Sequence, residues 1–418
     1  MLRQQSKWFG LPQPFWYLWT GVLINRLGGF VFTFLAIYLT QQRKFSVEEA
    51  GLVVSLYGVG SVCAGPVGGT LADRIGRKAT LLIGLLGAAS AMVYLGLARE
   101  YVYIAAGAVV LGFFNDLSRP ASQAAIADLV PPEDRVRAFG LHYWAINLGF
   151  AGSSMLAGFL ARFDFMWLFF GDAAATTLFG IIVLLRIPET RPSGEPHAGE
   201  HTPPTETQSR GPFAPYRDPI FLPLFVAQLI WAWIFMQSSS SLPLDMSQHG
   251  ISMSRYGQLA AINGLLIVLL QPFVLRHITR MPRALAMSVG VLLTGVGFGI
   301  CGFGSSVTIY IVSIVIWTLG EIVLSPILPT LIADLAPRSL RGTYQGGFQL
   351  AWGAALLLGP ALGGLVMGRF GSRTLWLICA ALGIGVAWTH LLIAPARRRR
   401  LSQLPDGNEA LRREQGSP

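Results

Sequence analysis

Apolar stretches long enough to cross a membrane recur along the whole chain, and no other feature constrains its fold so strongly. A run of roughly 18 or more apolar residues can cross the ~30 Å hydrocarbon core of a bilayer as a helix. Only 12% of the residues are charged, against about 25% in soluble domains. Because a backbone inside lipid must satisfy its own hydrogen bonds, we expect helices. The sequence therefore predicts an all-α membrane protein and excludes a disordered chain, a disulfide-rich mini-protein and an ordinary cytosolic enzyme.

The apolar stretches can be divided into twelve spans with soft edges. The short polar segment ahead of the first span does not have the pattern of a cleaved signal peptide. Lys and Arg are distributed unevenly, with 22 on the side that carries both termini and 7 on the opposite side. This asymmetry predicts cytoplasmic termini in a plasma or inner membrane, and it accounts for the net charge of +10 without a nucleic-acid partner. The predicted spans are 14–40, 48–72, 79–98, 101–125, 137–161, 165–187, 218–246, 254–276, 284–304, 306–333, 342–367 and 373–394.

The chain consists of two similar halves. The sequence IADLVP at 126–131 matches IADLAP at 332–337, an offset of 206 residues. Several Pro, Gly and Arg residues recur at the same offset without a gap, which chance agreement between apolar segments does not explain. A stretch rich in Pro, Gly, Glu and Thr separates the halves and cannot bury a core. We therefore predict a six-helix bundle over 1–187, a cytoplasmic linker over 188–217, a second six-helix bundle over 218–395 and a cytoplasmic tail over 396–418.

A charged loop between the second and third spans carries a specific motif. Residues 69–81 read GTLADRIGRKATL. This stretch resembles the signature loop of the major facilitator superfamily, G-x-L-A-D-R-x-G-R-K-x-x-L, with every fixed position filled. The resemblance covers the whole chain when the twelve spans and the internal repeat are included. It implies the major facilitator fold, in which twelve transmembrane helices form two parallel-related six-helix bundles, and a monomeric transporter of small molecules.

The charges of this loop are candidates for a gating role. Asp73 would be favoured at a helix N-terminus, and in the family that helix belongs to span 11. Arg77 can pair with Asp128 at the cytoplasmic end of span 4, so that the two contacts together would close the cytoplasmic side. The alternative is that the charges only set the topology. In the second half Thr279 stands at the position of Asp73, so any equivalent contact there is weaker. The candidate gating residues are Gly69, Asp73, Arg74, Gly76, Arg77, Lys78 and Asp128.

Strongly polar side chains inside the spans concentrate in spans 1, 4, 7 and 10 and are scarce in spans 3, 9 and 12. Such groups are costly in lipid and should face the protein interior or a wet cavity. We therefore expect spans 1, 4, 7 and 10 to surround a central cavity and spans 3, 9 and 12 to face lipid. The candidate residues for proton coupling or for the substrate cavity are Asn25, Arg26, Asn115, Asp116, Arg119, His142, Gln237, Glu321, Gln345 and Gln349.

Glu321 is the most informative of these candidates, because it lies near the middle of span 10. Burial of a carboxyl group favours its protonated form, which suits reversible proton binding. The alternative is a neutral or paired structural acid. Asp116 and Arg119, three residues apart, can neutralise each other as a structural pair. Arg26 could either attract an anionic group or balance Asp116, and His142 is either structural or titratable near neutral pH.

Two further segments resemble proton-driven multidrug exporters of the LmrP kind and, more loosely, MdtH-like proteins. They are WTLGEIV at 317–323 and HYWAINL at 142–148. In the former relatives, acids in spans 5, 7 and 10 are implicated in proton coupling. The chain keeps the span 10 acid as Glu321, but His142 and Ser239 stand where the other two acids would be.

The sequence thus predicts a secondary active transporter that couples efflux of amphipathic drugs or small metabolites to proton entry by alternating access. Two alternatives stay open: a uniporter or symporter for a polar metabolite, and a non-transporting membrane receptor or scaffold. There is no nucleotide-binding loop, nucleophile elbow or metal-ligand spacing, so neither enzyme activity nor a cofactor or metal is predicted. The expected partners are a small-molecule substrate, protons and the lipid bilayer.

Overall fold

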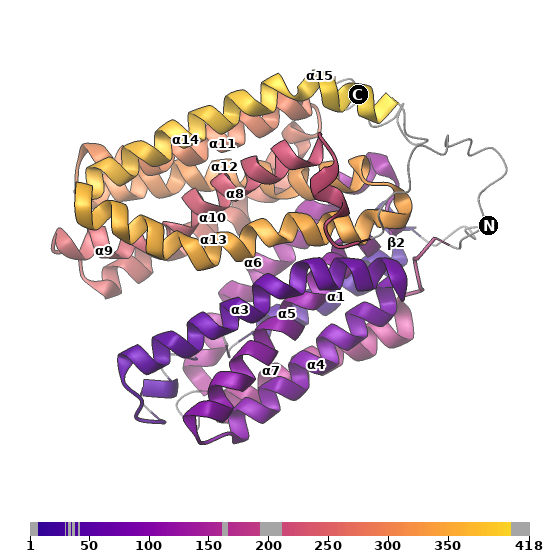
Figure 1. Ribbon diagram of the computed structural model, residues 1–418, viewed down its shortest axis with the longest axis horizontal. Coiled ribbons are helices and arrows are strands. Elements are labelled where there is room, and N and C mark those ends of the chain that lie inside the picture. Colours follow the sequence, from indigo (N-terminus) through magenta and orange to yellow (C-terminus); the bar gives the residue numbers. More distant parts are fainter. Residues whose placement is uncertain are drawn as a thin grey trace. The chain divides into compact units, whose positions relative to one another are not determined.

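A computed structural model of the chain describes residues 7–29, 31, 35, 38–40, 42–160, 166–192 and 211–402. The chain divides into two compact units (Figure 1). The first unit is Met1–Pro215 with Ala336–Gly353, and the second is Tyr216–Leu335 with Ala354–Pro418. Most of the predicted linker and tail lies outside the described residues, so the predicted boundaries of the two bundles stay a prediction.

Both units are built almost entirely from helices (Figure 1). A short antiparallel hairpin precedes the first helix. Its strands, β1 (Lys7–Trp8) and β2 (Leu11–Pro12), have two residues each. The first unit contains α1 (Gln13–Leu27), α3 (Val47–Arg74), α4 (Arg77–Leu97), α5 (Tyr101–Leu129), α6 (Arg135–Leu160) and α7 (Met166–Arg186), and also the start of α13 (Arg341–Phe370). The second unit contains α8 (Phe221–Met236), α9 (Ser241–Gln248), α10 (Met253–Ile278), α11 (Arg283–Ile300), α12 (Val307–Leu335), the rest of α13, α14 (Ser372–Leu392) and α15 (Ala394–Ser402).

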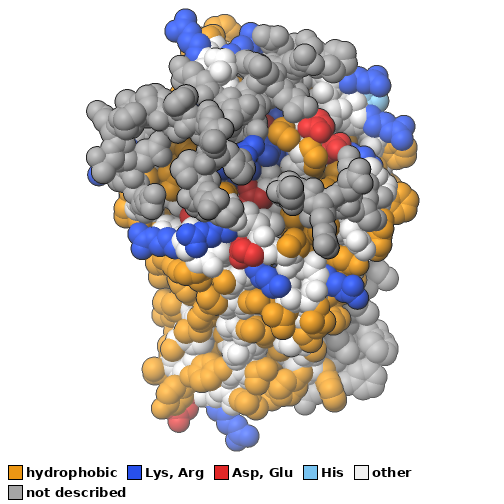
Figure 2. Space-filling model, turned by 90° about the vertical axis from the view of Figure 1, so that its right-hand side faces the viewer, with side chains coloured by type: hydrophobic (Ala, Val, Ile, Leu, Met, Phe, Trp, Pro, Cys, Tyr) orange, Lys and Arg blue, Asp and Glu red, His pale blue; other side chains and the backbone are white. Residues whose placement is uncertain are grey.

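The helices account for the predicted membrane spans. Within the described residues, ten helical segments are long and apolar enough to cross a membrane. They correspond to ten of the twelve predicted spans. The other two, predicted at 14–40 and 137–161, contain α1 and α6, and both reach beyond the described residues. Figure 2 shows broad hydrophobic areas on the visible surface, among which the charged side chains form small separate groups.

The internal repeat is visible in the helix bounds and in the packing. The bounds of α5 and α12 differ by the same 206 residues as the repeated sequences. In the first unit α4 packs on α5 and α7, and α3 packs on α5. In the second unit α11 packs in the same way on α12 and α14, and α10 packs on α12. The two halves of the sequence therefore fold with the same local packing.

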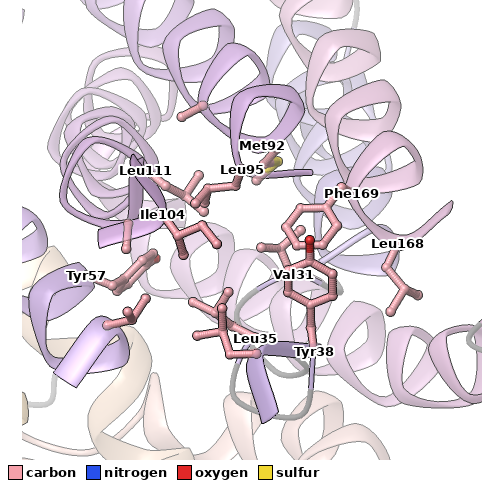
Figure 3. Close-up of a cluster of buried hydrophobic side chains, with 14 of the residues drawn as sticks. Val31, Leu35, Tyr38, Tyr57, Met92, Leu95, Ile104, Leu111, Leu168 and Phe169 are labelled. Carbon is pink, nitrogen blue, oxygen red and sulfur yellow. The ribbon is translucent and has the colours of Figure 1, made fainter. Parts of the chain in front are cut away.

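Close helix contacts in the first unit depend on small residues. A Cβ atom on Gly60 of α3 would collide with the carbonyl oxygen of Val109 on α5, and one on Gly112 would collide with the carbonyl oxygen of Tyr57. Around these contacts a buried apolar cluster joins α3, α4, α5 and α7 with the segment that follows α1 (Figure 3). The rings of Tyr38 and Phe169 lie edge to face in this cluster, with centroids 4.8 Å apart and planes inclined by 66° (Figure 3).

The predicted seventh span, 218–246, is not one continuous helix. It is divided into α8 and α9, with a break at residues 237–240. Pro243 explains the break, because its ring would clash with the carbonyl group four residues earlier in a continuous helix. The hydroxyl groups of Ser239 and Ser240 donate to the carbonyl oxygen of Met236 and so stabilise the end of α8. The predicted span is therefore confirmed as one segment, Phe221–Gln248, whose helix is interrupted at residues 237–240.

Candidate functional site

The charged loop of the signature motif packs on the first turn of α13 within the first unit. Asp73, at the end of α3, accepts hydrogen bonds from the backbone N–H groups of Gly342 (2.9 Å) and Thr343 (2.6 Å). Its Oδ2 also accepts a hydrogen bond from the Thr343 hydroxyl at 2.7 Å. The first N–H groups of a helix have no partner within the helix, so the carboxylate satisfies two of them and interacts favourably with the helix dipole.

Two arginines and a second carboxylate complete this arrangement. Arg77 Nε lies 3.0 Å from Asp128 Oδ2, and Arg341 Nη1 lies 2.7 Å from Asp128 Oδ1. Arg77 Nη1 is also 3.2 Å from Asp73 Oδ1. The side chains of all four charged residues are less than 10% exposed. Two negative and two positive charges balance, which is what burial of charged groups requires. Asp73, Arg77, Asp128, Arg341 and Thr343 are called the motif cluster below.

Glycines allow α3 and α13 to approach each other closely beside the motif cluster. A Cβ atom on Gly69 would collide with the carbonyl oxygen of Gly342, and one on Gly346 would collide with the carbonyl oxygen of Gly65. Any larger residue at these positions would push the helices apart and draw Asp73 away from the helix start. Gly69 of the motif therefore has a packing function that no other residue can replace.

Gly76 and Glu189 fix the loop that follows Asp73. Gly76 has φ of +110°, a conformation that favours glycine. Glu189 accepts hydrogen bonds from the N–H groups of Arg77 (2.8 Å) and Lys78 (3.1 Å), the first two residues of α4. A Cβ atom on Gly76 would collide with the Glu189 carboxylate. Lys78 in turn donates to the carbonyl oxygen of Leu184 at the end of α7. The sequence interpretation missed Glu189 because it assigned this residue to the linker.

The second unit contains a reduced counterpart of the motif cluster. Arg283 Nη2 lies 2.7 Å from Asp334 Oδ2, and both side chains are buried. These residues are equivalent to Arg77 and Asp128 at the offset of 206. The repeat thus preserves one ion pair between neighbouring helices in both units. Arg74, the remaining motif residue, is exposed at the end of α3.

The polar candidates of span 4 form one cluster inside the first unit. Asp116 Oδ1 lies 2.8 Å from Arg119 Nε, and its other oxygen accepts a hydrogen bond from Ser61 of α3. Asn115 donates to the hydroxyl group of Tyr57 at 2.6 Å. Asp116 is buried, whereas the side chain of Arg119 is 37% exposed. The ion pair therefore neutralises Asp116 and leaves the Arg119 guanidinium partly accessible.

Spans 1 and 5 bring further candidates to this cluster. Arg26 is close enough to Asp116, Arg119 and Tyr57 to interact electrostatically with all three. His142 in turn interacts with Arg26 and Arg119, and no atom of the described residues forms a hydrogen bond with its Nδ1. Asn25 points elsewhere and donates to Thr176 of α7 at 2.8 Å. Asp172 of α7 also interacts electrostatically with Arg26, so two aspartates stand against two arginines in this part of the described chain.

Glu321 is buried in the second unit on α12, with 3% of its surface exposed. Its Oε2 accepts a hydrogen bond from the side-chain amide of Asn263 on α10 at 2.7 Å. Asn263 also donates to the hydroxyl group of Thr318, one turn before Glu321, at 3.1 Å. A neutral amide therefore orients the carboxyl group. The sequence interpretation missed Asn263, although an amide inside an apolar span is a visible signal.

The three glutamine candidates lie in different surroundings. Gln237 is fully buried at the break between α8 and α9, where it donates to the carbonyl oxygen of Trp233 and accepts from Ser241. Gln345 and Gln349 belong to the part of α13 that packs with the first unit. Gln345 is fully buried and Gln349 is half-buried. Local hydrogen bonds thus occupy Gln237, which explains its burial without a substrate.

A hollow of about 340 Å³ lies between α8 and α14 in the second unit. All but one of the side chains that line it are apolar, and none of the predicted site residues is among them. Two of its residues, Leu222 and Val226, are also exposed on the surface of the helix. The hollow therefore does not offer a binding site for a polar or charged substrate.

Apolar helices in two similarly packed units, with buried charge clusters inside them, define a multi-pass helical membrane protein. A family model described as Major Facilitator Superfamily matches residues 18–254 and 224–415. The chain belongs to the major facilitator superfamily. It is therefore a transporter of the multi-pass membrane type and not an enzyme, which confirms the predicted fold class.

Several individual relatives are similar over most of their length. The uncharacterised transporter YttB of Bacillus subtilis (strain 168) is 28% identical over 91% of this chain and 95% of that protein. A Na(+), Li(+), K(+)/H(+) antiporter of Planococcus maritimus is 27% identical over 79% of this chain and 84% of its own. The multidrug resistance protein MdtH of Aeromonas salmonicida (strain A449) is 24% identical over 90% of this chain and 94% of its own.

The fold is also similar to that of a solved transporter. The crystal structure of the human organic anion transporter MFSD10 (TETRAN) superimposes with a TM-score of 0.75 at 17% identity, covering 91% of this chain and all of that one. At this identity the likeness supports the fold alone.

Proposed function

We propose that this protein exports amphipathic small molecules in exchange for protons. The observation that carries the proposal is Glu321, a buried acid on α12 that accepts a hydrogen bond from the side-chain amide of Asn263. An ionised carboxylate is costly at membrane depth unless a cation balances it. A buried carboxyl group therefore favours its protonated form, and binding and release of one proton would change the charge inside the second unit.

The motif cluster supplies the conformational step. It holds Ala336–Gly353 against the first unit, although the remainder of α13 belongs to the second. Alternating access requires the two halves of such a transporter to move relative to each other, so this packing exists in one state and is released in the other. We propose that the packed state is the one closed on the cytoplasmic side, with both termini in the cytoplasm of a monomer in the cell membrane.

The substrate class follows from the distribution of charge and from the relatives. Among the described residues of the first unit, the polar cluster balances two aspartates against two arginines, so it suits a ligand with little net charge. One relative is named a multidrug resistance protein, and another is named an antiporter with H(+) as one of its ions. The first name favours a small-molecule substrate and the second favours exchange against protons, and both favour transport over a receptor or scaffold role.

The test uses the full-length protein in proteoliposomes with an imposed pH gradient and ethidium as the amphipathic probe. The wild type should move ethidium against its concentration gradient only while the pH gradient lasts. Glu321→Gln should lose this driven transport. Glu100→Gln should retain it, because Glu100 is an exposed acid at the start of α5. Driven transport in Glu321→Gln equal to that of the wild type would refute proton coupling through Glu321.

A second candidate function is exchange of monovalent cations for protons, which the similarity to the Planococcus maritimus antiporter favours. In the same vesicles, an imposed Na(+) or K(+) gradient would then change the internal pH without ethidium. A pH change that depends on the cation and not on ethidium would favour this function over drug export.

A further inference from the structure

A second buried acid lies in the second unit, apart from Glu321. Asp245 on α9 is 1% exposed. Its Oδ2 accepts hydrogen bonds from the hydroxyl group of Tyr310 on α12 (2.9 Å) and from the indole N–H of Trp376 on α14 (3.1 Å). Figure 1 shows α9 at the end of the second unit opposite α15. Three helices thus hold this carboxyl group in a defined position.

His249 connects the buried carboxyl group to the surface. Its Nδ1 lies 2.8 Å from the backbone carbonyl oxygen of Asp245 and 3.5 Å from Oδ1 of the same residue. Because a carbonyl oxygen can only accept, Nδ1 carries a hydrogen in this arrangement. The imidazole side chain is 39% exposed. It can therefore exchange protons with water while it remains next to the carboxyl group.

No basic side chain among the described residues balances the charge of Asp245. Within the described part of the chain, no Lys or Arg pairs with Asp245, and no atom forms a hydrogen bond with its Oδ1. The other titratable groups around it are Tyr310 and Cys301, which are neutral when protonated. Burial of an uncompensated carboxylate is unfavourable. A proton on either Oδ1 or His249 removes the net charge, whereas the loss of that proton leaves a buried anion.

We propose that Asp245 and His249 form a proton-binding site of this transporter, distinct from Glu321. Ca²⁺ and Mg²⁺ need several oxygen ligands. They suit the site poorly, because Trp376 presents an N–H donor and no acceptor to the carboxyl group. The two donors on Oδ2 leave Oδ1 as the oxygen that takes up the proton. The site therefore alternates between a neutral and an anionic form when His249 is neutral.

The position of Tyr310 relates this site to Glu321. The two residues are eleven positions apart on α12, which is about 16 Å along the helix axis and about 20° around it. They therefore lie on the same face of the helix. Trp317 lies between them on that face, is 4% exposed, and has an indole N–H for which the described residues offer no hydrogen-bond acceptor. This N–H group places a polar atom between Tyr310 and Glu321 on the shared helix face. A role of the Asp245–His249 site in coupling to transport rests on the proposed function, whereas the proton-binding site itself does not.

Infrared difference spectra between acidic and alkaline buffer test the site directly in the full-length protein in liposomes. The wild type should show the C=O band of a protonated, buried carboxyl group that disappears in Asp245→Asn. The band should persist in Glu321→Gln and in the surface control Glu100→Gln. Tyr310→Phe should shift its frequency, because one hydrogen bond to the carboxyl group is lost. This second variant keeps the test valid if Asp245→Asn does not fold.

Spectra of Asp245→Asn that are identical to those of the wild type would overturn the site. A second result would also overturn it. If the carboxylate band changes when NaCl replaces choline chloride but does not change with pH, the site binds a cation and not a proton. The transport assay decides the role in coupling separately. Loss of pH-driven ethidium transport in Asp245→Asn supports this role, and unchanged transport overturns it. If the wild type shows no driven transport, the proposed function fails while the spectra still decide the site.

Discussion

Asp73→Asn perturbs the motif cluster with the least change in shape. The Asp73 carboxylate accepts three hydrogen bonds from Gly342 and Thr343 at the start of α13. Asparagine keeps one oxygen acceptor but turns an NH₂ group towards N–H and O–H donors, so it cannot keep all three bonds. The substitution also removes the negative charge from the helix N-terminus and from the neighbourhood of Arg77.

The size of the effect follows from the number and type of these contacts. A hydrogen bond to a charged group contributes about 1.5–3 kcal/mol net of water. Loss of one or two such bonds, partly compensated by the remaining oxygen, should cost the packed state about 2–3 kcal/mol. Since 1.4 kcal/mol corresponds to a factor of ten, the equilibrium between packed and released Ala336–Gly353 should shift about 30- to 100-fold towards release.

The accessibility of a cysteine at position 72, next to Gly342, measures this equilibrium. Ala72 is fully buried, and its Cβ atom lies 2.9 Å from the position that a Cβ on Gly342 would occupy. The assay is the labelling rate of Ala72→Cys by a water-soluble maleimide. Cys63 must be replaced by Ser because it is exposed, whereas the other two cysteines are buried.

Asp73→Asn should raise the labelling rate about 30- to 100-fold, and Glu100→Gln should leave it unchanged. An unchanged rate in a folded Asp73→Asn protein would refute the role of the motif cluster in holding this packing. The charges would then be left with a topological function.

Three further substitutions test other parts of the structure. Gly76→Ala should lower the thermal unfolding temperature in detergent, because its positive φ and the Glu189 carboxylate both oppose a side chain at a cost of about 1–3 kcal/mol; an unchanged temperature would contradict the loop geometry. Asp334→Leu should lower the stability of the folded protein by about 3–5 kcal/mol, because it leaves the Arg283 guanidinium buried without its partner. Adding Arg283→Met should restore most of the loss. An unfolding temperature of Asp334→Leu equal to that of the wild type would show that the ion pair does not stabilise the fold. Asn263→Ala should move the pH profile of driven ethidium transport by about one pH unit, because a hydrogen bond to a buried carboxylate is lost; an identical profile would exclude its role.

The helices were predictable because the signal for a membrane span lies within the span itself. Predicted bounds of 306–333 and 373–394 agree closely with α12 (Val307–Leu335) and α14 (Ser372–Leu392). The repeat was predictable for a similar reason, since Pro, Gly and Arg at a fixed offset need no knowledge of the fold. The break in the seventh span was missed although Pro243 and the preceding serines are visible in the sequence.

The contacts of the site residues were less predictable, because they join segments that are far apart in the chain. Glu189 is 112 residues from Arg77, and only the folded unit shows that its carboxylate caps α4. Asp245 stands near the end of a predicted span, four residues before His249. Its environment comes from Tyr310 and Trp376, 65 and 131 residues away. A search for every carboxyl group inside a predicted span would have found Asp245.

The exchange of protons for substrate can be measured most directly as proton movement caused by ethidium. An ethidium gradient is imposed on weakly buffered proteoliposomes that contain a pH-sensitive dye. With the wild type and with Glu100→Gln, ethidium moving down its gradient should drive protons the opposite way and change the internal pH. Glu321→Gln should give no pH change. Ethidium flux without any pH change in the wild type, or a full pH change in Glu321→Gln, would contradict proton-coupled export through Glu321.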